Sequence, residues 1–165
     1  MTEQKDLAAP YYASDWKRWR DPECPEYLDP TERLLDRHTK GARASATAIL
    51  CDGRALDYRE LLGEVCRAAH GLVAIGCTRE SRILFFATDS VEYVATWLAS
   101  VRSGLVPAVV SDAHKAHHLE YFLRDTAAAT LYIDDEQLPK LEAIRDRLPD
   151  TLERVIVRES AETLS

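Results

Sequence analysis

The sequence predicts an α/β fold in which helices cover both faces of a mainly parallel β-sheet. Short apolar runs alternate with amphipathic stretches of about a dozen residues, an order typical of right-handed β-α-β units. The 165 residues are 46% hydrophobic and 30% charged, which fits a folded domain rather than a disordered chain. The sequence contains no internal repeat and no low-complexity tract.

Residues 1–33 differ in composition from the rest of the chain. They contain the proline-rich stretch DPECPEYLDP and two of the three tryptophans, Trp16 and Trp19. Because proline fixes φ and lacks a backbone donor, we expect an irregular arm whose aromatic side chains pack on the body. A surface arm that binds a partner is the alternative. We therefore divide the chain into this arm and an α/β unit over residues 34–165.

The α/β unit is predicted to begin with a β-hairpin and a long helix. In ATAILCDGRALDY, from residue 46, two extended pieces flank an Asp52-Gly53 turn, which is a strong hairpin signal. Asp57 is predicted to cap the helix, with Glu60 in the capping-box position and Gly76 just past the helix end. The apolar face of this helix has helical spacing and comprises Tyr58, Leu61, Leu62, Val65, Ala69 and Leu72.

Four strands and three helices are predicted to follow. We expect the strands at 83–87 and in the segments LVPAVVS, ATLYID and RVIV, and the helices at 90–102, 114–125 and 137–148. Gly104 stands just past the end of the first of these helices. The run LVPAVVS is apolar at successive positions, as in a parallel strand that is covered on each side.

Charge and hydropathy exclude several classes of function. The net charge of −7 and the pI of about 5.2 argue against a nucleic-acid surface, which requires clustered Lys and Arg. The longest apolar runs are shorter than the roughly 20 residues of a membrane-spanning helix, and the N-terminus has no signal-peptide pattern. We therefore expect a cytoplasmic protein.

The four cysteines do not predict a metal or redox site. Cys24, Cys51, Cys66 and Cys77 are widely spaced and form no C-x-x-C pair, so neither a zinc knuckle nor a redox dithiol is indicated. Cys66 lies among apolar helix residues and is interpreted as a small buried hydrophobe.

Acidic residues follow two of the predicted strands. Asp89 ends the first and is a candidate ligand or phospho-acceptor residue, and Asp134 with Asp135 is a candidate acidic metal pair. A phospho-acceptor site also needs a lysine at a later strand end, whereas the last strand runs into Arg158-Glu159-Ser160. We therefore predict that Asp89 caps the following helix and that Glu92 completes a capping box.

Other signals of catalysis are weak or absent. His114, with His117 or His118, has the spacing of a zinc pair on one helix face, but no H-E-x-x-H motif occurs, and we interpret the three as first-turn residues of a half-exposed helix. The sequence has no G-x-S-x-G elbow, no G-x-G-x-x-G and no G-x-x-x-x-G-K-[ST] loop. No residue of this chain is assigned a catalytic role.

Three segments, in this order, resemble those of a known family. LDYREL (56–61) resembles the L-T-Y-x-E-L segment of adenylate-forming enzymes, the superfamily of acyl-CoA synthetases, luciferases and peptide-synthetase adenylation domains. TDSVEYVATWLASVRSGLVPAVVS (88–111) resembles their P-N-S-x-E-F segment, which leads through a helix into A-G-A-V-x-V-P-x-N. LEYFLRDTAAATLYI (119–133) resembles their L-x-Y-x-L-x-D-S-x-A helix and strand. The likeness covers about residues 32–157 and is closest to benzoate-CoA ligases and other aryl- or acyl-CoA synthetases.

The departures from the family pattern fall in loops. Asp89 stands where the family often has Asn, and residues 79–82 read Arg-Glu-Ser-Arg where Pro-Gly-Asp-Arg is common. Some members use a basic residue in the loop after the V-P-x-x-N strand to contact CoA phosphates. The resemblance therefore implies His114 and Lys115 as candidate CoA-phosphate contacts, with solvated helix-start residues as the alternative.

The resemblance implies the N-terminal part of an ATP-dependent acid–CoA ligase with a partial adenylate-forming-enzyme fold. Such a ligase joins an aryl or acyl carboxylic acid to ATP, which gives an acyl-adenylate, and then transfers the acyl group to CoA, with Mg²⁺ on the phosphates. In this family the phosphate-binding loop, acid pocket and mobile C-terminal domain lie downstream of the region seen here. We therefore expect this chain to be inactive alone, to bind none of ATP, Mg²⁺ or CoA tightly, and to be able to self-associate through apolar surface.

A second hypothesis belongs to a different class. The chain would be a stand-alone, non-catalytic α/β module, either an interaction domain or a receiver-like domain phosphorylated at Asp89.

Overall fold

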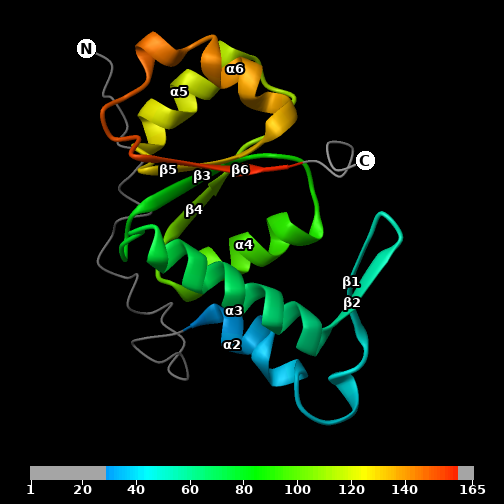
Figure 1. Ribbon diagram of the computed structural model, residues 1–165. Coiled ribbons are helices and arrows are strands. Elements are labelled where there is room, and N and C mark those ends of the chain that lie inside the picture. The colour runs from blue at the N-terminus through cyan, green and yellow to red at the C-terminus, as the bar shows by residue number, and fades with distance from the viewer. Residues whose placement is uncertain (1–28, 160–165) are drawn as a thin grey trace, which may run out of the picture.

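A computed structural model describes residues 29–159 and confirms the predicted α/β class. Its main sheet has four parallel strands in the order β4-β3-β5-β6 (Figure 1). Their bounds are Arg82–Phe86 for β3, Val106–Val109 for β4, Thr130–Asp134 for β5 and Arg154–Arg158 for β6.

One face of the sheet is covered by α3 (Tyr58–Ala74) and α4 (Val91–Arg102), as Figure 1 shows. Side chains alternate between the faces of a strand, so Ile83 and Phe85 of β3 and Tyr132 of β5 all point to this side. They pack against Leu61, Val65 and Leu72 of α3 and Leu98 of α4. The aromatic rings of Phe85 and Tyr132 have centroids 5.1 Å apart.

The opposite face is covered by α5 (Ala116–Thr126) and α6 (Leu138–Glu142), which lie above the sheet in Figure 1. The alternate positions of the same strands point here: Leu84 and Phe86 of β3, and Leu131 and Ile133 of β5. They contact Leu119 and Leu123 of α5 and Ile144, all buried. The central strands β3 and β5 are therefore apolar on both faces, as the prediction of a covered parallel sheet requires.

The predicted hairpin and capping box are confirmed. Strands β1 (Thr47–Cys51) and β2 (Arg54–Asp57) pair antiparallel around Asp52 and Gly53, which have φ values of 49° and 76°. Two consecutive positive φ values match a type I′ turn, whose twist suits a hairpin. The Asp57 side chain accepts from the backbone amides of Arg59 and Glu60, and the Glu60 carboxylate accepts from the Asp57 amide.

The short helix α2 (Pro30–Leu34) is attached to α4 by Arg102. The Arg102 guanidinium donates to Thr31 Oγ1 at 3.0 Å and pairs with Asp36, which lies in a 3-10 turn at Asp36–His38. Cys66 is half-buried and its Sγ accepts from Arg102 at 3.7 Å, so it is more polar in its contacts than predicted. The predicted arm lies outside the described residues up to residue 28, including Trp16 and Trp19.

Three sequence predictions differ from the structure in extent. Helix α5 begins at Ala116, so His114 precedes it. The helix predicted at 137–148 is only α6 and a 3-10 turn at Arg145–Arg147, because from Ile144 onward the backbone amides bond to the carbonyl three residues back. It ends at Leu148, which precedes Pro149 and takes an extended backbone. Strand β4 is an edge strand with exposed Val106 and Val109, since an apolar run does not reveal whether a strand has a neighbour on both sides.

The prediction that Asp89 caps α4 is wrong. Ser90 is the N-cap, and its Oγ accepts from the Tyr93 amide at 3.0 Å. Both residue types are good caps, but Ser90 is the buried one and Asp89 is exposed. Glu92 therefore does not complete a capping box with Asp89; it pairs with Arg54 of the hairpin.

We predict that Ser90→Ala lowers the free energy of unfolding by about 1 kcal/mol, because the Tyr93 amide loses its acceptor. Asp89→Ala is the matched control one residue away and should leave stability within roughly 0.5 kcal/mol of the parent. Urea denaturation followed by circular dichroism measures both. A larger loss for Asp89→Ala than for Ser90→Ala would restore Asp89 as the cap.

Candidate functional site at the carboxyl edge of the sheet

The carboxyl ends of the four parallel strands form the edge where doubly wound sheets bind ligands. Chain connections leave β3 toward β4 on one side and leave β5 toward β6 on the other. The strand order therefore reverses between β3 and β5. In open α/β sheets, ligands bind in the crevice at such a switch point. Thr88 follows the end of β3, and Asp134 is the last residue of β5.

A hydrogen-bonded network of Thr88, Asp134 and Arg158 closes this crevice. Asp134 Oδ2 accepts from the Thr88 amide and from Thr88 Oγ1, both at 2.8 Å. Asp134 Oδ1 accepts from Arg158 Nε at 2.7 Å, and Arg158 Nη2 donates to Thr88 Oγ1 at 2.7 Å. Three neighbouring strand ends are thus joined through one carboxylate that is 3% exposed.

The network holds Asp134 in its charged form. Burial opposes ionisation, but the hydrogen bonds from Arg158 and from Thr88 outweigh it, so the pKa of Asp134 is lowered. The same bond raises the pKa of Arg158. Below them, burial raises the pKa of Tyr132 to about 12. With both oxygens of Asp134 bonded inside the protein, this crevice is a structural junction rather than an open ligand site.

Arg54 connects the hairpin to the same edge. Its guanidinium pairs with Glu92 at the start of α4 and lies 3.5 Å from Glu64 of α3. Partial burial opposes the charge on Glu92, but its own backbone amide and Arg54 outweigh it and lower the pKa of Glu92. An open hollow of about 520 Å³ lies between the hairpin turn, the start of α4 and the end of β6, with Cys51, Arg54, Glu92 and Arg158 among its lining residues.

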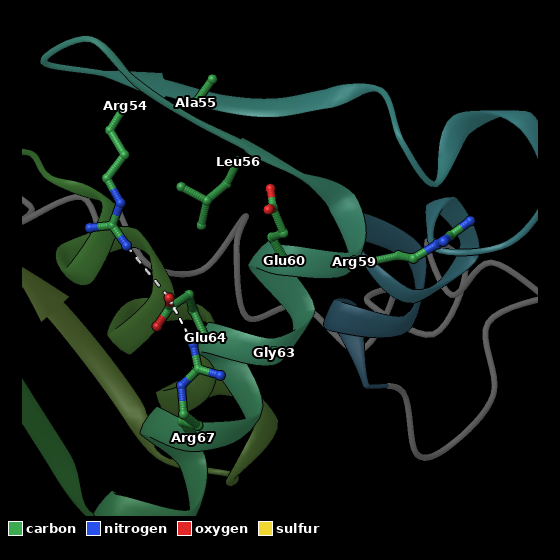
Figure 2. A pocket seen from close by; sticks show the side chains of 8 residues that line it. All are labelled: Arg54, Ala55, Leu56, Arg59, Glu60, Gly63, Glu64 and Arg67. Carbon is green, nitrogen blue, oxygen red and sulfur yellow. Dashed lines mark ion pairs between the residues drawn. The ribbon is translucent and has the colours of Figure 1, made fainter.

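A second hollow, of about 570 Å³, lies between β2 and α3 (Figure 2). Figure 2 shows Arg54 and Arg67 directed at Glu64 from opposite sides, while Arg59 points away from them. Arg67 Nη2 lies 2.7 Å from Glu64 Oε1. Two of the three arginines here are therefore neutralised by a carboxylate, and the hollow does not form an anion site.

The candidate residues His114 and Lys115 lie in the turn before α5, also at the carboxyl edge. Lys115 is the N-cap residue of α5, no side chain caps this helix, and its first turn has no acidic residue. The His114 and His118 rings have centroids 5.1 Å apart, and those of His117 and His118 are 4.0 Å apart. Partial burial and the neighbouring basic side chains lower the pKa of His118, whose Nδ1 is buried without a partner.

Lys115 and the uncapped N-terminus of the helix make the start of α5 electropositive. Helix N-termini carry partial positive charge, and an uncapped one leaves backbone donors for an anion. The nearby Asp112 is engaged with α6, since its backbone oxygen accepts from Lys140 at 2.6 Å and its carboxylate lies 3.4 Å from Gln137 Nε2. Across residues 29–159, no group of three or more His, Cys, Asp and Glu side chains is placed to hold a metal ion. No described helix is long and apolar enough to cross a membrane.

Sequence reasoning identified Asp134 and Arg158 as strand-end residues but did not pair them. They lie 24 positions apart in the chain and meet only because β5 and β6 are neighbours in register, with Asp134 opposite Arg158. Opposite charges at the ends of adjacent predicted strands were the available signal. Thr88 carried no such signal, because its role depends on the order of the strands.

The order of the strands and the network at their carboxyl ends define the chain as a doubly wound α/β unit. Thr88, Asp134 and Arg158 close the crevice at its carboxyl edge. The model of one family, described as AMP-binding enzyme, matches residues 35–164. The chain belongs to this family of AMP-binding enzymes.

The relatives that it resembles are CoA ligases and synthetases. It is 30% identical over 131 residues to a 3-hydroxybenzoate--CoA/4-hydroxybenzoate--CoA ligase of Thauera aromatica. The matched residues make up 79% of this chain and 25% of the ligase. It is 35% identical over 116 residues to an acetyl-coenzyme A synthetase of Cupriavidus pinatubonensis, and this match covers 67% of this chain and 18% of the synthetase. The chain thus spans about a quarter or less of these relatives' length.

A solved structure supports the same assignment. The anthranilate CoA ligase AuaEII, crystallised with anthranoyl-AMP, matches with a TM-score of 0.74 and 28% identity over 82% of this chain and 26% of that one. The predicted resemblance to adenylate-forming CoA ligases is confirmed.

We predict that Asp134→Asn destabilises the fold by roughly 3 kcal/mol at neutral pH, because Arg158 loses its buried counter-charge. Folding lowers the pKa of Asp134, so its contribution is complete above the unfolded value of about 3.9 and is lost as the pH falls through the lower folded value. The difference between parent and variant should therefore shrink in acid. Urea denaturation from pH 7 downward measures it.

The control for this measurement is Glu136→Gln, two residues on and exposed, which should be within roughly 0.5 kcal/mol of the parent. The stabilising role of the Asp134–Arg158 pair would be contradicted if the free energies of unfolding of parent and Asp134→Asn differed little at neutral pH. A difference that grew as the pH fell would contradict it as well.

Proposed function

We propose that this chain forms the first α/β unit of an ATP-dependent acid–CoA ligase. The observation that carries the proposal is the AMP-binding family match over residues 35–164, with CoA ligases among the relatives. In the proposed reaction an acid carboxylate attacks the α-phosphorus of ATP, which gives an acyl-adenylate and releases pyrophosphate. The CoA thiolate then attacks the acyl carbon and releases AMP.

The proposed substrate is an aryl or acyl carboxylic acid, used in the cytoplasm. The relatives named for hydroxybenzoate, benzoate and anthranilate favour an aryl acid, and those named for acetyl-CoA favour a short acyl acid. When bound, Mg²⁺ would screen the ATP phosphates, and no described residue group is assigned to it.

Within this scheme, residues 34–165 serve as a scaffold that is inactive alone. The sequence has no glycine-rich phosphate loop with a lysine, and the Thr88, Asp134 and Arg158 network occupies the crevice between β3 and β5. The proposed contribution to binding is at the start of α5, where Lys115 and His114 contact a phosphate of CoA. The uncapped helix and the absence of acidic residues in its first turn support this role.

Pyrophosphate exchange with a panel of aryl and short acyl acids tests the ligase proposal. We expect no exchange with the 165-residue chain, and acid-dependent exchange with any longer polypeptide of the same gene. Exchange by the 165-residue chain would overturn the scaffold role. Phosphorylation of Asp89 by acetyl phosphate, detected by mass, would instead favour the receiver-like hypothesis.

A binding experiment on the chain itself tests the start of α5. Adenosine 3′,5′-bisphosphate, the nucleotide part of CoA, should shift the imidazole proton resonances of His114 and His117. Lys115→Ala should weaken this binding by about tenfold, through loss of one charge-assisted contact. Lys40→Ala, another exposed lysine, is the control and should have no effect. If the two substitutions weakened binding equally, the binding would be a non-specific attraction between charges and the proposed site would be wrong.

A further inference from the structure

The loop between α2 and β1 carries a group of positive side chains at the surface. Its basic residues are Arg37, His38, Lys40 and Arg43. Within residues 29–159 none of these side chains forms an ion pair with a carboxylate. The neighbouring Asp36 is engaged by Arg102 instead. In a chain whose net charge is −7, this loop is therefore a local concentration of unbalanced positive charge.

Two guanidinium groups approach the two nitrogen atoms of the His38 ring. Arg37 Nε donates to His38 Nε2 at 2.9 Å, and Arg43 Nη1 lies 3.5 Å from His38 Nδ1. A neutral imidazole has one accepting nitrogen, and a guanidinium group only donates. When Nε2 accepts from Arg37, Nδ1 carries the ring proton and faces a second donor. Arg43 is therefore left without an acceptor at this ring.

The surroundings of His38 disfavour a positive charge on its ring. Partial burial and then the charges of Arg37 and Arg43 lower the pKa of His38. From α3 the ring is contacted by the aromatic ring of Tyr58, with centroids 4.8 Å apart. A bound anion would reverse this balance, because it would accept from both guanidinium groups and would favour the imidazolium form.

We propose that Arg37, His38 and Arg43 bind a divalent oxyanion of the phosphate class, either as a free ion or as the phosphate group of a small molecule. Phosphate oxygens match the planar fork of a guanidinium group. A tetrahedral oxyanion presents oxygens to three donor groups at once, whereas a carboxylate has only two oxygens. The inference rests on the contacts of this loop and does not depend on the proposed ligase function.

A hollow of about 440 Å³ beside the loop offers space for the organic part of such a molecule. Arg37, Thr39 and Lys40 line it together with Leu62 of α3, so it combines polar and apolar surface. Glu32 also lines this hollow and has no ion pair in the described part of the chain. Its negative charge opposes an anion there and provides a test of sign.

The site is separate from the proposed CoA-phosphate contacts. Figure 1 shows α2 and the loop that follows it on the α3 side of the main sheet, whereas α5 covers the opposite side. The ring resonances of His38 therefore report on this site, and those of His114 and His117 report on the start of α5. Failure of one proposal leaves the other intact.

Titration of the His38 ring resonances with sulfate tests the site, because sulfate stays divalent between roughly pH 6 and pH 8. His38→Gln assigns the resonances. They should shift with sulfate, and the affinity should rise about tenfold from pH 8 to pH 6, since a bound dianion favours the imidazolium. Chloride at equal ionic strength controls for screening. No shift beyond that in chloride, or an affinity that does not rise as the pH falls, would overturn the proposal.

Charge-removing substitutions test whether the binding is local. Arg43→Gln should weaken sulfate binding about tenfold, through loss of one charge-assisted contact. Arg82→Gln removes an exposed arginine that has no ion pair within residues 29–159, at the start of β3, and should leave the affinity unchanged. Arg43→Lys, which keeps the charge, is used if the glutamine variant does not melt like the parent. Equal weakening at positions 43 and 82 would make the binding a general attraction and overturn the site.

Inorganic phosphate and phenyl phosphate distinguish the two forms of the ligand. Binding of phenyl phosphate that is about threefold tighter assigns the hollow to the organic part, and Glu32→Gln should then strengthen it further. Equal affinities assign the site to the free ion. If neither compound shifts the His38 resonances more than chloride does, the proposal is wrong.

Discussion

The Asp134 carboxylate joins three strand ends because its two oxygens accept hydrogen bonds from different neighbours. Thr88 follows β3 and Arg158 ends β6, while Asp134 itself ends β5. Leaving a buried carboxylate without these partners would cost several kcal/mol. The loops after β3 and β5 are therefore held in one arrangement, and this fixes the position of Ser90 and the start of α4.

Features that depend on neighbouring residues could be predicted from the sequence. The capping box of Asp57 and Glu60 and the Asp52-Gly53 turn follow from interactions within a few positions, and both are confirmed. The cap of α4 could not be chosen, because Asp89 and Ser90 are adjacent and equally suitable by type; burial of Ser90 decided it. The junction of Asp134 with Arg158 required the strand order, which periodicity does not contain.

The same limit applies to the candidate binding residues. His114 was predicted as a first-turn helix residue, yet α5 begins two positions later, so His114 and Lys115 lie in the preceding turn. Their residue types suggested anion binding only through the family resemblance. The structure adds two local observations, an uncapped helix and a first turn without acidic residues. Neither follows from spacing alone, because a cap forms only if a side chain reaches back to the amides.

A closed crevice restricts where this unit can meet a ligand. Entry between β3 and β5 would have to break the two hydrogen bonds that Thr88 donates to Asp134 and leave one oxygen of a buried carboxylate without a partner, a cost comparable to the binding energy of a weak ligand. We therefore propose that any ligand at the carboxyl edge would bind beside the crevice. In the hollow near Arg54 the positive charge of Arg54 is neutralised by Glu92. The start of α5 instead combines an uncapped helix with the basic side chain of Lys115. The proposed anion site at this edge is therefore at the start of α5, whereas the Asp134 junction maintains the sheet.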